Sequence, residues 1–195
     1  MICVLRTLRE RTREDTMLLN RDMALMLAGF LLSACGAPQL FPPPVMDGTD
    51  THFDFVVWKN APNAQVDKKV QLGGQAFEVI ESEGETLIVV RQQPIVYVPA
   101  YGPRSRGRRT GEFVVSYTGR LPANAIAKGH KLIVIGTTQK TRVIALEDGK
   151  QTFPAIRAFC IHVWKTGMRD DISEFSSVGA GNESLEENTH CISGQ

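Results

Sequence analysis

The feature that most constrains this chain of 195 residues is an uncharged apolar run, residues 24–34, that ends directly at Cys35. Its length suits the apolar part of a secretory signal peptide, roughly 7–15 residues, whereas a membrane-spanning helix needs about 20. A signal peptide is removed and contributes nothing to the folded core. We therefore predict that residues 1–34 are a signal peptide and that the working protein begins at Cys35. The alternative is a short buried helix that happens to end in Ala-Cys.

The residues before the apolar run suit a signal peptide less well. Residues 1–16 carry a mixture of positive and negative charges, and Arg21 is followed at once by Asp22. We interpret residues 1–16 as an over-long gene start, with the true start at Met17 or Met23.

The end of the run, Leu32-Ser33-Ala34-Cys35, resembles the lipobox of bacterial lipoproteins. In that class a signal peptidase cuts before the cysteine, whose thiol carries a diacylglycerol. Small residues such as Ser33 and Ala34 fit the narrow cleft of a signal peptidase. We predict that Cys35 is the lipid attachment site, which makes the membrane a partner of the chain. Each buried methylene contributes about 0.8 kcal/mol, so two or three acyl chains anchor firmly where one does not.

The charge balance bears on the partners of the chain. From Cys35 onward, Lys and Arg together are as numerous as Asp and Glu, so the processed chain is neutral. Nucleic-acid binders depend on an excess of basic residues that neutralise phosphates. The sequence therefore predicts no nucleic-acid partner.

Two cysteines remain for the folded domain, Cys160 and Cys191, because Cys3 is lost with the signal peptide and Cys35 is acylated. An oxidising periplasm allows such residues to pair. However, Cys160 lies in an apolar stretch and Cys191 in a polar one, which is weak support for a disulfide. We expect a buried free thiol at Cys160 and keep the disulfide as the alternative.

Composition divides the processed chain into three parts. Residues 35–49 are rich in proline, which resists helix formation, so we predict an extended tether. Residues 50–166 carry most of the apolar residues and are predicted to form the folded domain. Residues 167–195 are rich in Ser, Glu, Asn and Gly, and we predict a disordered tail.

The folded domain is predicted to be mainly β. A helix over residues 51–60, capped by Asp50, and a strand over the same residues both fit the pattern. The pair Gly73-Gly74 predicts a bulge or a sharp bend. Short apolar runs at roughly 8–12-residue spacing indicate a small closed or partly open β-barrel. The predicted strands are residues 70–80, 86–90, 95–98, 112–118, 131–138, 142–146 and 153–166.

Five stretches carry a resemblance to one known family by their order and spacing: residues 32–35, 68–79, 116–121, 130–139 and 161–164. Together they resemble the Slp-type (starvation-inducible) outer-membrane lipoproteins of Gram-negative bacteria. The resemblance implies an acylated periplasmic domain of OB-like form, without established enzymatic activity, that serves the envelope under starvation or acid stress. Better-known members end in an aromatic- and Pro-rich tail, whereas residues 167–195 here are acidic and polar. Gly36, which follows the acylated position, is compatible with sorting to the outer membrane.

A Gly- and Pro-rich loop after Tyr101 is crowded with arginines. Guanidinium groups match phosphate oxygens, so one interpretation is an anion contact with lipid phosphate or lipopolysaccharide. The interpretation we favour is a solvated loop in which the like charges of the arginines repel one another. The residues are Arg104, Arg106, Arg108 and Arg109.

The sequence offers little to an enzyme. It contains no G-x-S-x-G, H-E-x-x-H, P-loop or dinucleotide-binding motif. Cys160 and His162 share a strand face and His130 precedes a neighbouring strand, but no further Cys or His lies at metal-ligand spacing. We predict no enzymatic activity, no metal and no cofactor.

The function predicted from the sequence is that of a non-enzymatic lipoprotein on the periplasmic face of the outer membrane. It supports envelope integrity or the stress response through protein or lipid partners. The alternative is an OB-like module that binds a saccharide or a lipid head group on its barrel face. Stacking aromatics beside basic residues mark such faces. One exposed patch that contains Tyr97, Tyr101, Tyr117 and Trp164 would favour the alternative.

Overall fold

The computed structural model describes residues 39–82, 84–97, 100–105, 110–167, 172 and 185–192. Two short α-helices, α2 (Pro43–Met46) and α3 (Phe55–Asn60), and the 3-10 helix η2 (Pro62–Ala64) come first in the chain. Strands follow, so the prediction of a mainly β fold is confirmed. The strands are β1 (Lys69–Ser82), β2 (Glu85–Gln92), β3 (Ile95–Val96), β4 (Gly102–Pro103), β5 (Glu112–Tyr117), β6 (Lys131–Leu146), β7 (Gly149–Trp164) and β8 (Glu187–Cys191).

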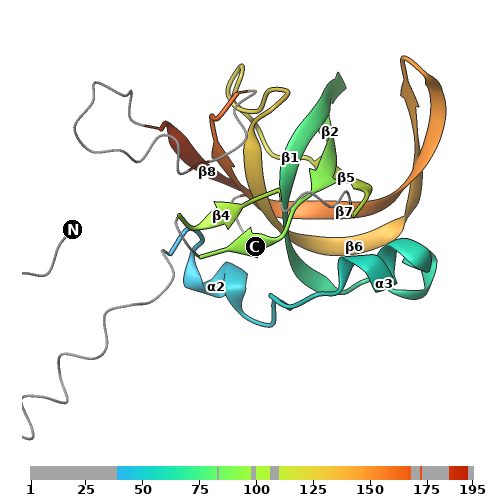
Figure 1. Cartoon of the computed structure of the whole chain (residues 1–195), viewed down its shortest axis with the longest axis horizontal. Helices are drawn as coiled ribbons and strands as arrows, with labels where there is room; N and C mark the ends of the chain where they lie inside the picture. Colours follow the sequence, from blue (N-terminus) through green and yellow to red (C-terminus); the bar gives the residue numbers. More distant parts are fainter. Residues whose placement is uncertain are drawn as a thin grey trace, which may run out of the picture. The chain divides into compact units, whose positions relative to one another are not determined.

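Five of the strands close into a ring of hydrogen bonds, in the order β1, β2, β5, β7, β6 and back to β1 (Figure 1). The neighbours are antiparallel, except that β5 and β7 run parallel where Val114, Val115 and Ser116 meet β7. This strand ring is the five-stranded arrangement that the expected OB-like form requires. The strand β8 extends the sheet along the free part of the β7 edge.

The strand β1 changes neighbours at Gly74, which pairs with both Leu132 of β6 and Gln92 of β2. A Cβ atom at this position would lie 2.5 Å from the backbone oxygen of Arg91. Only glycine permits so close an approach of two backbones. The bulge in β1 lies further along the strand than the predicted glycine pair, between Ala76 and Glu78.

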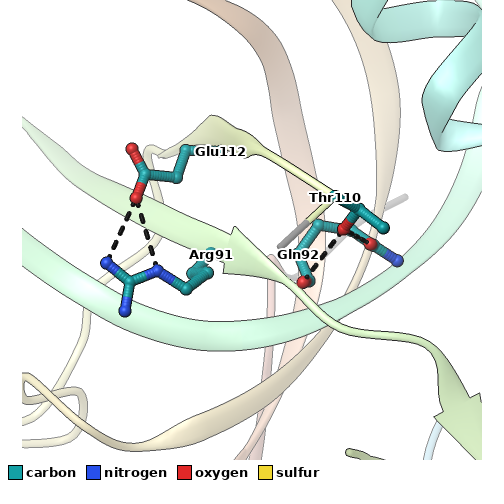
Figure 2. Close-up of polar contacts among 4 residues, drawn as sticks. All are labelled: Arg91, Gln92, Thr110 and Glu112. Atoms are coloured by element: carbon teal, nitrogen blue, oxygen red, sulfur yellow. Dashed lines mark hydrogen bonds and ion pairs between the residues drawn. The ribbon is translucent and has the colours of Figure 1, made fainter. Parts of the chain in front are cut away.

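The bulge leaves Phe77 unpaired on the outer side of β1. Its ring lies beneath two cations, the guanidinium of Arg91 at 4.9 Å and the ammonium of Lys128 at 5.0 Å from the ring centroid. Arg91 also pairs with Glu112 on β5, with an N–O distance of 3.3 Å (Figure 2). These contacts fasten β1 to β2 and β5 outside the hydrophobic core.

The inside of the strand ring is filled by apolar side chains from all five strands. Successive strand residues point to opposite faces, so Ile88 and Val90 of β2 belong to this inner core while Leu87 and Val89 face outward. From α3, Phe55 and Trp58 pack against Phe113 of β5.

The helix α3 begins at Phe55 because the Asp54 carboxylate accepts hydrogen bonds from the backbone N–H groups of Val56 and Val57. Asp50, the predicted cap, instead accepts from the N–H of His52. The helical alternative for this segment is thus the observed one, and its start lies later than predicted.

The outside of the strand ring is also covered, in one place at β2 and β5 and in another at β6 and β7. This explains why these strands are nearly continuous apolar runs. The hairpin of β6 and β7 extends beyond the ring (Figure 1) and packs over the outer face of β2 and β5. We call this second core the hairpin cluster: Leu87, Val89, Val114, Ile144, Phe153 and Ala155. A third core, the N-terminal cluster, lies on the outer face of β6 and β7: Phe41, Ile133, Ile135, Cys160, Trp164 and Ile172.

Candidate functional site

The predicted site residues fall mostly outside the described part of the chain. Cys35, Arg106, Arg108 and Arg109 lie outside it, so their roles stay predictions. Arg104 is described, and its backbone N–H donates to the carbonyl of Pro94 over 3.0 Å.

The other described end of the arginine loop is fixed at the end of β2. The Thr110 hydroxyl bonds to Gln92 (Figure 2), and the Lys59 ammonium donates to the Thr110 carbonyl over 2.7 Å. The described flanks of the loop are thus held against β2 and α3.

The residues that follow the predicted anchor pack on the domain instead of forming an extended tether. We call residues 39–50 the lead segment. Phe41 is only 4% exposed and sits in the N-terminal cluster, and Leu40, Val45 and Met46 pack beside it. Further on, Asp50 forms backbone hydrogen bonds with β1. The tether prediction is therefore wrong for the lead segment, because burial of Phe41 favours docking and proline is tolerated in the first turn of α2.

The end of the chain also joins the sheet. Strand β8 pairs with β7, and a disulfide joins Cys160 to Cys191, which lie opposite each other on the two strands. The prediction of a disordered tail is wrong for Glu187–Cys191, and the expected free thiol at Cys160 is wrong as well. Composition misled because β8 is a polar edge strand that gains its stability from pairing and from the covalent bond.

One buried histidine links β7, β8 and the lead segment. Nδ1 of His162 lies 2.7 Å from the Thr189 hydroxyl, which donates its proton to the carbonyl of Leu40 over 3.0 Å. A hydroxyl has one proton to give, so Nδ1 of His162 must be the donor to Thr189. The neutral tautomer then leaves Nε2 bare and 3.5 Å from the carboxylate of Glu187.

The surroundings of His162 favour its neutral form. The imidazole is 4% exposed and lies edge-on to Phe41 and Trp164. Burial lowers the pKa of His162, the Glu187 carboxylate opposes this, and nearby His190 adds to the lowering. His162 and Cys160 cannot bind a metal together, because the sulfur of Cys160 is in the disulfide.

The aromatic patch that would favour a saccharide-binding module does not form. Tyr117 and Trp164 are buried, at 1% and 3% exposure, while Tyr97 is 66% exposed and lies beside Tyr101. The face of the second and third ring strands, which binds ligands in OB folds, is covered by the hairpin cluster. Among the described residues, the exposed aromatic patch that would favour a module binding a saccharide or a lipid head group is therefore missing.

A hollow of about 410 Å³ lies beside β6, where the strand bulges. Gln139 pairs with Ala155 and Arg142 with Phe153, so Lys140 and Thr141 of β6 face the single residue Pro154. Proline has no N–H for the ladder, and a bulge accommodates it. The freed N–H of Thr141 donates to the Asn63 side chain over 2.9 Å. We call this hollow the bulge groove.

The bulge joins two predicted strands, residues 131–138 and 142–146, into the single strand β6. Sequence analysis did not identify the groove that results. Pro154, which lies inside a predicted strand, could have indicated the bulge, because a proline in a strand requires a bulge or an edge position.

Three cationic side chains line the bulge groove: Lys140, Arg142 and Arg157. Arg142 forms a two-pronged ion pair with Glu85 of β2, at 2.8 and 2.6 Å, and Ser116 donates to the same carboxylate over 2.7 Å. The hydrogen bonds from Arg142 lower the pKa of Glu85, and Glu85 in turn raises the pKa of Arg142. This pair fastens the β6–β7 hairpin to the strand ring.

The groove lacks the pairing of nucleophile and base that acyl transfer requires. Ser116 is a candidate nucleophile, but its partner Glu85 is held ionised, and a base with a lowered pKa takes protons poorly at neutral pH. Within the described ranges, no three His, Cys, Asp or Glu residues are grouped so that they could hold a metal ion. The helices among the described residues are all too short or too polar to cross a bilayer.

Comparison with known proteins places this chain. The family model described as "Outer membrane lipoprotein Slp family" matches residues 32–180, well over half of the chain. The chain therefore belongs to this family of outer membrane lipoproteins. Among curated proteins, none matches the chain. The matched region begins at Leu32 and includes Cys35, while the strand β8 lies beyond it.

Proposed function

We propose that this protein is a lipid-anchored, non-enzymatic component of the outer membrane that faces the periplasm and supports the envelope, including under stress. The observation that carries the proposal is the family match, which starts at the first residue of the stretch Leu32-Ser33-Ala34-Cys35. In this proposal Cys35 becomes the acylated N-terminus of the processed chain.

Two features of the domain support the proposed compartment and the proposed lack of catalysis. Disulfides such as Cys160–Cys191 persist in oxidising compartments, of which the periplasm is one. The Ser116–Glu85–Arg142 contacts serve to fasten the hairpin, since an ionised, paired carboxylate is a poor base.

The anchor is tested by replacing the acylated residue. Expression in a Gram-negative host with labelled palmitate should give a labelled protein whose intact mass starts at Cys35 and includes the lipid. The Cys35→Ser variant should carry no label and should keep its signal peptide, because the peptidase requires the modified cysteine. Ser33→Ala, which keeps a small residue before the cysteine, is the matched control and should be labelled and processed like the wild type. An unlabelled wild type with its N-terminus intact would overturn the proposal.

The envelope role is tested by complementation. A strain that lacks the gene should become more permeable to bulky hydrophobic antibiotics, and the wild-type gene should restore the barrier. The Cys35→Ser gene should fail to restore it, because the protein is then not placed on the outer membrane. Full restoration by Cys35→Ser would separate the role from the anchor and contradict the proposal.

A further inference from the structure

We propose that the bulge groove binds a small phosphorylated polyol, with Lys140 and Arg157 contacting the phosphate and Asp67 accepting hydrogen bonds from hydroxyl groups. This inference goes beyond the envelope role and does not depend on the anchor. The volume of the groove, about 410 Å³, lies in the range of small-molecule sites, roughly 300–1,000 Å³. It is too large for a bare phosphate ion to fill.

The two cations are available for a ligand. Arg142 is neutralised by Glu85, whereas Lys140 and Arg157 are exposed and form no ion pair with any residue the structure describes. They come from adjacent strands, β6 and β7, and line the same hollow. Guanidinium and ammonium groups form charge-assisted hydrogen bonds with phosphate oxygens, which are stronger than neutral ones.

The wall that carries Lys140 is built to hold its position. The bulge residue Thr141 is bonded through its backbone N–H to Asn63, and the bulge faces Pro154, which cannot re-form the ladder. Bulges aim side chains out of the regular alternation of a strand, which is one reason they occur beside binding sites. The groove therefore offers a cation on a fixed backbone.

Asp67, which also lines the groove, has a left-handed backbone conformation, with a φ of 61°. This conformation is uncommon outside glycine, although Asp tolerates it better than most residues. It is held by a hydrogen bond from the Asp67 N–H to the Thr138 carbonyl over 2.9 Å, while the Thr138 hydroxyl donates to Gln65 over 2.6 Å. A carboxylate repels a phosphate but accepts hydrogen bonds from hydroxyls.

The combination selects a chemical class. Two cations on β6 and β7 favour a phosphate, and the carboxylate of Asp67 in the same hollow favours hydroxyls. Val66, Ala155 and Ile156 give the hollow its apolar surface. Glycerol phosphate has both groups. It exists as a free metabolite and as the head group of phosphatidylglycerol, so the same contacts serve either source.

Calorimetric titration of the full-length chain in a mild nonionic detergent tests this site. The probe is sn-glycerol 3-phosphate, with glycerol as the uncharged comparison. We expect saturable binding of one glycerol phosphate and none of glycerol. The Lys140→Gln/Arg157→Gln variant should bind about a hundredfold more weakly, about tenfold for each charge-assisted contact.

The matched control removes the same charges elsewhere. Lys150→Gln/Arg120→Gln replaces an exposed lysine and an exposed arginine that do not line the groove, and it should bind like the wild type. Thermal unfolding of both variants shows whether they are folded. Asp67→Gly, which tolerates the positive φ, removes both the acceptor for the hydroxyls and the negative charge, so it should weaken glycerol phosphate relative to inorganic phosphate.

A second titration distinguishes the two sources of glycerol phosphate, the free metabolite and the lipid head group. It uses mixed micelles that contain phosphatidylglycerol or phosphatidylcholine. If the head group occupies the groove, phosphatidylglycerol weakens the apparent binding of glycerol phosphate, and phosphatidylcholine does not. If the free metabolite is the ligand, neither lipid competes. The proposal is overturned if the wild type shows no saturable binding, or if the groove variant and the control variant bind alike.

Discussion

At the scale of single residues, His162 connects parts of the chain that are far apart in sequence. Its Nδ1 donates to Thr189 of β8, whose hydroxyl donates to Leu40 of the lead segment. Three described histidines, His130, His162 and His190, have a pKa below the ordinary value, and burial is the largest cause for each. Their neutral forms therefore belong to the folded state.

The sign of the resulting pH dependence follows from proton binding. A histidine whose pKa is lower when folded binds protons more readily in the unfolded state, so unfolding becomes easier as pH falls below about 6.5. We expect the free energy of unfolding in urea to be lower at about pH 5 than at about pH 7.5. His162→Gln should reduce this difference, because it removes one of the titrating groups. Tryptophan fluorescence follows the unfolding.

His52→Gln provides the matched control, since His52 is exposed on the surface before α3. It should leave the difference between the two pH values as it is in the wild type. Equal pH dependence in wild type and His162→Gln would show that His162 does not contribute. Glu85 adds a second loss of stability in stronger acid, because its pKa is lowered and its pairing with Arg142 is lost when it is protonated.

Prediction of single residues from the sequence succeeded where a local pattern determines their contacts. It failed where the contacting residue is distant in the sequence. The proximity of Cys160 and His162 on one strand follows from their spacing. The partners of these residues, Cys191 and Thr189, come from a polar segment whose place in the sheet no local pattern indicates. Lys140 and Arg157 were not identified as a pair because only the register of β6 and β7 brings them to one hollow.

At the scale of elements, β8 is joined to β7 by a covalent bond as well as by its hydrogen-bonded ladder. The Cys160–Cys191 disulfide closes a loop with a sequence separation of 31, and the strand otherwise pairs with β7 alone among the described strands. Closing a loop of that length removes unfolded-state freedom worth about 3–4 kcal/mol. Loss of the bond should therefore weaken both the strand and its contact with the lead segment.

Replacement of both cysteines tests this dependence. Cys160→Ala/Cys191→Ala should lower the melting temperature by roughly 10 °C, since each kcal/mol corresponds to about 2–4 °C for a domain of this size. Hydrogen exchange should show faster exchange of the β8 amides and of Leu40 and Phe41. Cys35→Ser, which keeps the disulfide, is the control and should melt like the wild type. An unchanged melting temperature in the double variant would show that β8 is held by its hydrogen bonds alone.

Element prediction was most accurate for strands with strong apolar patterns. The predicted strands 86–90, 112–118 and 131–138 correspond to β2, β5 and the first half of β6. The hairpin cluster was not foreseen, because the outward residues Leu87, Val89 and Val114 look like any buried strand run until β6 and β7 fold over them. Residues 40–46 were predicted to be extended because of their prolines, although the burial of Phe41 decides their place.

At the scale of the whole molecule, the lead segment leaves only a short stretch of chain between Cys35 and the folded domain. Only Gly36, Ala37 and Pro38 separate Cys35 from Gln39, the first described residue. Four residue steps reach at most about 14 Å when fully extended. If Cys35 carries the lipid that we propose, Gln39, where the described domain begins, lies within this distance of the lipid-bearing residue.

Insertion of a flexible spacer tests the short connection. A Gly-Ser segment of about 20 residues between Ala37 and Pro38 adds a mean reach of roughly 25 Å. Energy transfer from Trp58 and Trp164 to dansyl-labelled lipid should fall in vesicles that contain the acylated protein. The same segment inserted after Ile192 should leave the transfer unchanged. Equal transfer in all three proteins would show that something other than the lead segment holds the domain near the lipid.

So short a connection to an acylated cysteine would change which molecules the domain encounters. With so few free residues after the acylated cysteine, the fold would explore a thin layer of fluid next to one leaflet and would diffuse mainly in two dimensions. Molecules that reside on that leaflet would be present at high effective concentration, so weak contacts would suffice to populate a complex. If the anchor is where we propose, docking of Phe41 against the strands would favour weakly binding partners that reside on the same leaflet.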